Sequence, residues 1–293
     1  DEDENVYERA IKARTFDILR GFLPAGVTTQ LSWHTNLRQA YDKLALLHHY
    51  PLPEVRAVAA GIHNLLRERY GHSFSHQLDE NQEKYRQLIG KRHTYFLEKK
   101  YPNDFRATTD IRYNNLLKYR ELIAVRPPRI NLPHFLTEYG LCTFNFLLDF
   151  GSFRDIHRHR NGVCRMPLLT TSFGFNNWYL DQLPPTLARA ARTLIREQKT
   201  AITSLKLTPE LTQYYIAMGF NVSCRVSYGL PATVYVTELR SGKMVHPTLR
   251  RVAHQMDKFL RRKFPLLKLH SDLDPDDWDV RRGKQDIREM SSI

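Results

Sequence analysis

The stretch "LCTFNFLLDFGSFRDIHRHR", residues 141–160, changes from a strand pattern to a helix pattern and ends in a basic triplet. Gly151 and Ser152 mark the expected start of the helix, which leads into Arg158, His159 and Arg160. Adjacent cationic side chains repel one another, so this triplet indicates an anionic ligand or compensating carboxylates nearby. Alternation of apolar with more polar residues predicts a half-buried strand before it, with these side chains on one face: Cys142, Phe144, Phe146, Leu148 and Phe150.

The bulk composition indicates a globular protein with a basic surface. Of the 293 residues 42% are hydrophobic, and the formal net charge is +13. A charge of this size attracts polyanions, nucleotides or acidic membranes. No apolar run is long enough to span a membrane, and the acidic N-terminus lacks a signal-peptide pattern. Three widely spaced cysteines favour a reducing compartment, so we expect a cytoplasmic protein without a disulfide framework or a metal site.

An internal repeat relates residues 21–59 to residues 214–253 at an offset of 193 that later becomes 194. Each copy is expected to form a short β segment after a glycine, then a helix, a proline-marked turn and a second amphipathic helix. The paired positions include apolar residues, glycines and arginines: Leu23 with Ile216, Gly26 with Gly219, Val27 with Phe220, Leu46 with Leu239, and Arg56 with Arg250.

The repeat predicts how the chain is divided. Residues 75–205 have no counterpart before residue 20. We therefore expect four parts: 1–72 is the C-terminal half of a first unit, 73–107 a charged helical connector, 108–280 a complete second unit, and 281–293 a basic tail. Either a further part of a longer tandem protein or another part of an assembly would complete the first unit.

The segment "TEYGLCTFNFLLDFGSFRDIHRHRNGVCRMPL" resembles the central segment of flavin-dependent thymidylate synthases. In that family an "FTF"-like strand leads into a helix that ends in Arg-His-Arg, and the 20 residues from Glu138 to Arg158 match the family spacing. Arg20 before "FLP", the Asn36-Leu37-Arg38 triplet and Arg240 in "TELR" resemble later family elements. The resemblance implies an α+β fold, an antiparallel sheet flanked by helices, here in tandem with a partial first copy.

The resemblance also implies roles for these residues. Arg158, His159, Arg160, Asn36, Arg38 and Glu138 would bind FAD, Arg20 and Arg158 would bind the nucleotide, and Arg240 would be catalytic. Each position has a structural alternative. In these alternatives Asp149 and Asp155 balance the triplet, Asn36 is a helix N-cap and Arg240 stands at a helix C-terminus. Arg20 would then lie in a surface turn and Glu138 at a strand start.

Several polar family positions are replaced in this chain. Leu168 stands where the family has a Ser, Met166 where it has a Glu, and Asp155 where it has a Gln. The position that closes the first copy's turn is Leu47 rather than Arg, and the second-copy counterparts of Arg20, Asn36 and Arg38 are Gln213, Gly229 and Pro231. These changes remove polar contacts to a substrate, and each lost buried hydrogen bond costs about 1–3 kcal/mol of binding.

Two function classes follow from the resemblance. The first is a divergent FAD-dependent thymidylate synthase that methylates dUMP to dTMP with methylenetetrahydrofolate and NADPH, with composite sites shared between the two halves and with self-association into a homo-oligomer or pseudo-tetramer. The second is a catalytically silent relative that acts as a nucleotide-binding, regulatory or scaffolding subunit. Binding to nucleic acid would rest on net charge alone, since no reader motif accompanies it.

Overall fold

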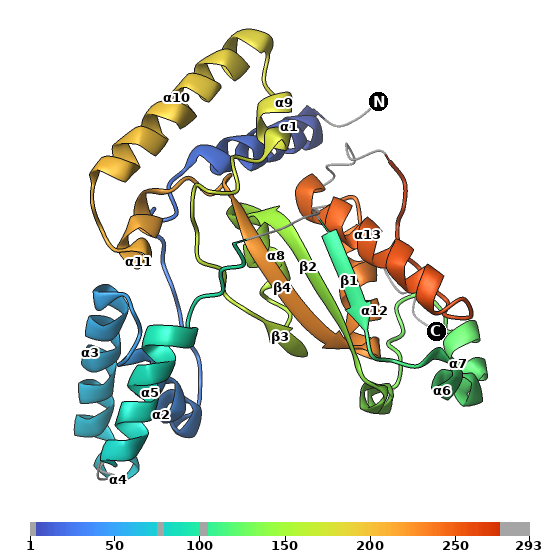
Figure 1. Cartoon of the computed structure of the whole chain (residues 1–293), viewed down its shortest axis with the longest axis horizontal. Coiled ribbons are helices and arrows are strands. Elements are labelled where there is room, and N and C mark those ends of the chain that lie inside the picture. The colour runs from blue at the N-terminus through green and yellow to red at the C-terminus, as the bar shows by residue number, and fades with distance from the viewer. Residues whose placement is uncertain (1–3, 75–78, 100–104, 276–293) are drawn as a thin grey trace.

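The computed structural model describes residues 4–74, 79–99 and 105–275, which form a mixed α+β protein (Figure 1). The expected basic tail at 281–293 and parts of the expected connector at 73–107 lie outside the described residues. The strands are β1 (Phe105–Thr109), β2 (Leu141–Asp149), β3 (Gly162–Cys164) and β4 (Asn221–Gly229). The 3-10 helices are η1 (Arg20–Phe22), η2 (Leu117–Tyr119), η3 (His134–Tyr139) and η4 (Gln213–Tyr215).

The α-helices surround the sheet or form a separate cluster beside it (Figure 1). They are α1 (Glu4–Leu19), α2 (Leu37–Leu47), α3 (Pro53–Arg69), α4 (Gly71–Phe74), α5 (Glu80–His93), α6 (Tyr113–Leu116), α7 (Arg120–Val125), α8 (Phe150–Ile156), α9 (Asn177–Asp181), α10 (Pro185–Ser204), α11 (Pro209–Thr212), α12 (Leu230–Ser241) and α13 (Pro247–Lys263).

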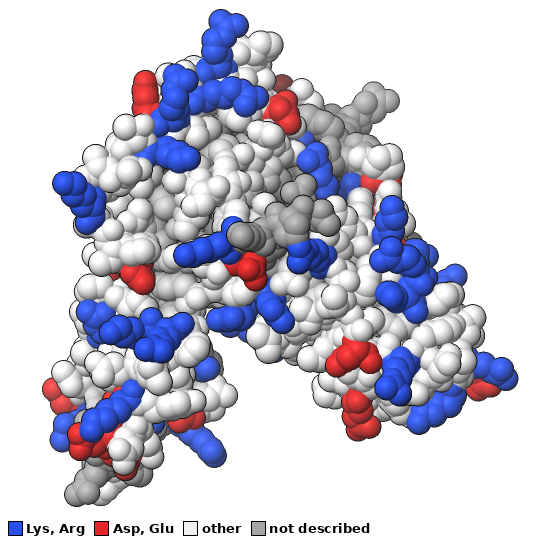
Figure 2. Space-filling model, viewed as in Figure 1, with Lys and Arg blue, Asp and Glu red and all other residues white. Residues whose placement is uncertain are grey.

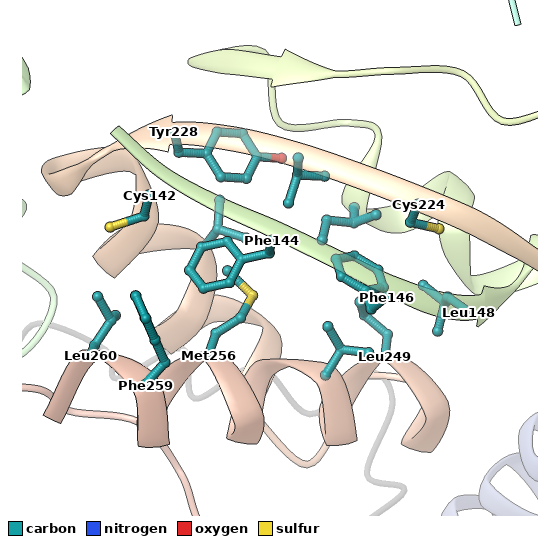
Figure 3. Packing of buried hydrophobic residues seen from close by; sticks show 14 of the residues in the cluster. Cys142, Phe144, Phe146, Leu148, Cys224, Tyr228, Leu249, Met256, Phe259 and Leu260 are labelled. Atoms are coloured by element: carbon teal, nitrogen blue, oxygen red, sulfur yellow. The ribbon is translucent and has the colours of Figure 1, made fainter. Parts of the chain in front are cut away.

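The sheet is antiparallel throughout, with strand order β1-β2-β4-β3. β2 and β4 pair along their full length, from Leu141 with Gly229 to Asp149 with Asn221. One sheet face packs on α13, where the Phe144 and Phe259 rings lie 5.6 Å apart (Figure 3). The predicted alternation of β2 is confirmed, because the side chains of Cys142, Phe144, Phe146 and Leu148 are buried. The fifth residue of the pattern, Phe150, begins α8 instead.

The turn from β2 into α8 is fixed by a buried carboxylate. Asp149 is the N-cap, and its Oδ2 accepts hydrogen bonds from the backbone N–H of Ser152 at 2.8 Å and from the Tyr179 hydroxyl at 2.7 Å. Its Oδ1 accepts a bond from the Thr248 hydroxyl at 2.5 Å. The helix thus starts before the expected Gly151 and Ser152, because a carboxylate cap satisfies its first free N–H groups.

The helices of the two repeat copies occupy equivalent positions in the sequence. α2 and α12 start at the 193 offset, and α3 and α13, of 17 residues each, correspond at the 194 offset. The expected β segment of the first copy is wrong: all of residues 27–36 are described, and none is in a strand. Residues 27–36 have the alternating pattern of a strand, but no partner strand lies beside them among the described residues. In the second copy the equivalent residues form β4 between β2 and β3.

The two copies meet through a symmetric set of backbone hydrogen bonds. Pro24 and Ala217, which are equivalent in the repeat, form an antiparallel bridge. The N–H of Ala25 donates to the carbonyl of Ile216, and the equivalent N–H of Met218 donates to the carbonyl of Leu23, both at 2.8 Å. Exchanging equivalent residues turns one bond into the other, which is the signature of a two-fold axis. The chain therefore contains a local pseudo-two-fold between its copies.

The helices of the first copy form their own small core. Ala40, Leu44, Ala59 and Phe74 are buried together in the cluster of α2, α3 and α4, apart from the main core of the sheet. α5 packs beside this cluster (Figure 1). Among the described residues, no helix combines the length and the apolar character that crossing a membrane would need.

Candidate functional site

The Arg-His-Arg turn lies between α8 and β3, at the end of the sheet where β4 leads into α12. Gly162 allows the chain to return against β4, since a Cβ there would lie 2.4 Å from the carbonyl oxygen of Ser227 and 2.4 Å from the Tyr228 ring. β3 then pairs Gly162 with Tyr228. Residues 158–160 lie beside α12, whose Tyr235 and Arg240 contact His159.

Arg240 holds the turn by two hydrogen bonds. Its Nε donates to Nε2 of His159 at 2.9 Å, and its second guanidinium nitrogen donates to the backbone carbonyl of Asp155 at 2.6 Å. Burial, and then the charge of Arg240, lower the pKa of His159 to about 4. His159 is therefore a neutral hydrogen-bond acceptor near pH 7, and the positive charge of the site comes from its arginines.

The turn borders a cavity of about 280 Å³. Arg158 and Arg160 line it from the turn, and Tyr228, Ala232 and Tyr235 line it from β4 and α12. The His159 and Tyr235 rings pack edge to face at 5.9 Å. Cationic and aromatic groups around a small hollow suit an anion or a planar ring.

The two outer arginines of the turn are solvent-exposed. The Arg158 side chain is 73% exposed and lies 3.5 Å from Oδ1 of Asp155, an exposed ion pair that contributes little to stability. Arg160 is also exposed and lines a second, larger groove of about 1000 Å³ beside α2, α3 and α5. The structure thus brings the turn of the second unit up to the helices of the first.

A further arginine, which the sequence analysis missed, adds to the positive charge. Arg154 on α8 has its pKa lowered by burial and then by the charge of Arg20, with a smaller effect from Arg158. Arg20 itself is largely buried and pairs with Asp17, whose carboxylate oxygen is 3.7 Å away. The arginines of η1, α8 and the turn therefore share one electrostatic neighbourhood. The repeat interface creates this proximity, and no local sequence signal reveals it.

The two first-copy residues, Asn36 and Arg38, lie at the start of α2 and are exposed. Asn36 is the N-cap of that helix, and its Oδ1 accepts a hydrogen bond from the N–H of Gln39 at 2.9 Å. Neither residue lines the cavity beside the turn or the larger groove. Asn36 is therefore a helix N-cap, as its structural alternative expects. The capping bond uses only its side-chain oxygen, so its amide N–H groups can bind other partners.

Glu138 lies in η3, just before β2, and is exposed. Its end of the sheet is also the end of the turn, because Leu141 pairs with Gly229 and Gly162 with Tyr228. β4 lies between β2 and β3, so these two strands are about 10 Å apart. Glu138 does not line the cavity beside the turn.

The replaced family positions have structural roles in this chain. Residues 166–168 pair with Phe96: its N–H donates to the carbonyl of Met166 at 2.8 Å, and its carbonyl accepts from Leu168 at 2.9 Å. Met166 packs against the main core. Gln213, the counterpart of Arg20, is buried and accepts a hydrogen bond from the N–H of Leu169 at 2.9 Å. Met166 thus contributes an apolar side chain to packing, and Gln213 supports the backbone at Leu169.

Cys164 lies in β3, directly after the turn. Burial raises the pKa of Cys164 to about 12, so its thiol is protonated and a weak nucleophile near pH 7. Within the residues that the structure describes, no group of three or more His, Cys, Asp and Glu side chains could hold a metal ion.

Lys and Arg are prominent on the face shown in Figure 2, where a notch separates the α2–α5 lobe from the sheet.

The sequence comparisons find no matching family model. The chain is similar to a UPF0159 protein of Chlamydia pneumoniae, with 28% identity over 52% of this chain and 28% of that one. It is also similar to UPF0159 proteins of Chlamydia muridarum and Thermoplasma acidophilum, at 24% and 23% identity over 97% of this chain and 62% and 64% of theirs. The chain spans less than two thirds of the length of each of these relatives.

Proposed function

We propose that this chain is a divergent protein of the flavin-dependent thymidylate synthase kind, which binds FAD and a nucleotide such as dUMP. The observation that carries the proposal is the convergence of Arg158, Arg160 and Arg240 on one turn beside a cavity of about 280 Å³. The resemblance of residues 137–168 to that family gives the ligand its chemical identity.

The arginines of the turn suit the anionic part of a dinucleotide. A guanidinium binds phosphate through two parallel hydrogen bonds, which are stronger than its exposed pairing with a carboxylate. Arg158 and Arg160 are exposed enough to make such bonds. The cavity is small for a whole dinucleotide. Asn36 and Arg38, from the first half of this chain or of another copy, and Glu138 would therefore bind the rest, in a composite site of a self-associating protein.

The reaction implied is the reductive methylation of dUMP to dTMP, with methylenetetrahydrofolate and NADPH as co-substrates; bound FAD would supply the hydride transfer. Arg240 would stabilise negative charge on the pyrimidine. In that role its guanidinium has to give up, or share, its bonds to His159 and to the Asp155 carbonyl. Arg20 would contact the nucleotide, although it pairs with Asp17 in this structure.

The second candidate is a catalytically silent subunit that keeps ligand binding. Met166 and Leu168 support it, because both stand at polar family positions and are used in packing or backbone pairing. The hydrogen bond from Arg240 to His159 also favours the silent subunit. A silent subunit would need the arginines of the turn for binding and would need no free catalytic guanidinium.

Two measurements separate these candidates. Uptake of added FAD, followed by the yellow absorbance of protein-bound oxidised flavin after gel filtration, tests flavin binding. A colourless protein that takes up no FAD contradicts the active enzyme and leaves a silent regulatory or scaffolding role. Tritium release from dUMP labelled at C5, with FAD, methylenetetrahydrofolate and NADPH present, tests catalysis. Flavin uptake without tritium release would assign the silent role.

A further inference from the structure

An apolar groove of about 1000 Å³ lies on the cluster of α2, α3 and α5. Its apolar lining includes Leu31, Trp33, Val58 and Ile62. Leu31 is 91% exposed and Val58 57% exposed, and Leu65 on α3 is 66% exposed. Contiguous exposed apolar surface of this kind marks an interaction site in a soluble protein.

The repeat shows what covers the equivalent surface in the second copy. Val58, Ile62 and Leu65 on α3 correspond to Val252, Met256 and Phe259 on α13. All three α13 residues are buried, with exposed fractions of 6%, 1% and 3%. Met256 and Phe259 point toward Phe144 and Phe146 of β2 (Figure 3). An antiparallel sheet therefore covers this helix face wherever the unit is complete.

The segment before α2 has the pattern of the missing central strand. Val27, Thr29, Leu31 and Trp33 stand where β4 and the residue before it place Phe220, Val222, Cys224 and Val226, all of them buried. Each segment ends at the N-cap of its following helix, Asn36 in one copy and Gly229 in the other. A strand requires a partner to satisfy its backbone groups, so the pattern alone leaves residues 27–36 irregular.

We propose that the groove is the docking site of an antiparallel sheet, to which residues 28–36 add the strand equivalent to β4. The occupant is a sheet-forming segment of the kind that residues 105–164 supply in the second unit, and it belongs to a longer form of the same polypeptide. The Chlamydia muridarum and Thermoplasma acidophilum relatives favour this source, since 97% of this chain matches only 62% and 64% of their length.

A second copy of the chain is a poorer occupant. The apolar face of its sheet is already buried under its own α12 and α13, and so cannot cover another helix pair.

The test is hydrogen–deuterium exchange on the protein encoded by the complete gene, compared with residues 1–293 alone and without added flavin. We expect the amides of 28–36 to exchange at least about a hundredfold more slowly in the complete protein, and to approach the protection of 221–229. Leu31→Asp should abolish this gain without affecting 221–229. The matched control is Leu187→Asp on α10, which is 57% exposed and outside the groove.

Three results would overturn the proposal. They are fast exchange of 28–36 in the complete protein, protection that grows with protein concentration and so assigns the groove to a second copy, and a complete gene that encodes no further sheet-forming segment. The exchange of residues 28–36 is measured without flavin, so this proposal can hold even if the proposed flavin function fails. The flavin function can likewise hold if residues 28–36 exchange fast.

Discussion

His159 shows how one residue in the candidate site differs from its sequence-based interpretation. The basic triplet of residues 158–160 suggests three cations. His159, however, is half-buried and accepts a hydrogen bond from Arg240 at 2.9 Å. Its neutral form is therefore the native form. The sequence predicted the cluster but could not predict its charge, because the partner comes from α12, 81 residues away.

The depressed pKa of His159 predicts a pH dependence of stability. Its native pKa is about 4, below the ordinary value of 6.5. The unfolded chain therefore takes up a proton before the native state does, and the stabilisation present above about pH 6.5 is lost as the pH falls toward 4. Denaturant unfolding of His159→Gln should show a shallower loss over this interval, by about 1–2 kcal/mol after allowance for solvent screening. Parallel curves for the variant and the wild type would refute this.

Arg240 contributes to that shift through its charge. In Arg240→Gln the repulsion is removed and burial remains, so the pKa of His159 should rise while staying below 6.5. An NMR titration of the imidazole protons measures it. His157 is the internal control, since burial and Arg160, rather than Arg240, lower its pKa. An unchanged His159 titration would show that the hydrogen bond to Arg240 does not form in solution.

At the scale of elements, local patterns predicted β2, α8, the charged helical connector and the helices of the two repeat copies. They did not predict α1 or α10. The periodicity of residues 247–260 and the alternation of residues 142–148 were sufficient signals. Residues 27–36 have the alternation of a strand without being one, because a strand depends on partners that sequence pattern cannot supply. The Asp149 cap was missed although its bond to the N–H of Ser152 is local. Its further partners, Tyr179 and Thr248, come from distant helices and could not be predicted.

The interface between η1 and η4 depends on two equivalent glycines. A Cβ at Gly26 would lie 2.7 Å from the Tyr214 carbonyl oxygen, and a Cβ at Gly219 would lie 2.8 Å from that of Gly21. Each substitution to Ala should therefore lower the free energy of unfolding by about 1–3 kcal/mol. Gly61→Ala on α3 is the matched control, since nothing lies within 4 Å of its added Cβ, and it should stabilise by about 0.5–1 kcal/mol. Equal effects at all three glycines in denaturant unfolding would contradict a close symmetric contact.

At the scale of the whole molecule, the two repeat copies differ in what accompanies their helices. Among the described residues, the sheet packs with α12 and α13, whereas the equivalent helices α2 and α3 have no sheet beside them. The division into a partial and a complete unit stays a prediction from the repeat. The gathering of Arg20, Arg154 and the basic turn near the interface was not, because it depends on how the two units face each other.

Calorimetric titration with FAD measures the proposed binding of a flavin dinucleotide's anionic groups by Arg158 and Arg160. The wild type should bind FAD, and Arg158→Gln with Arg160→Gln should weaken binding by at least about tenfold, because each guanidinium bond to a phosphate contributes about 1.5–3 kcal/mol. Arg189→Gln with Arg196→Gln, on the exposed surface of α10, should leave binding unchanged and controls for net charge. Equal FAD affinity in all three proteins, or no binding to the wild type, would contradict the claim.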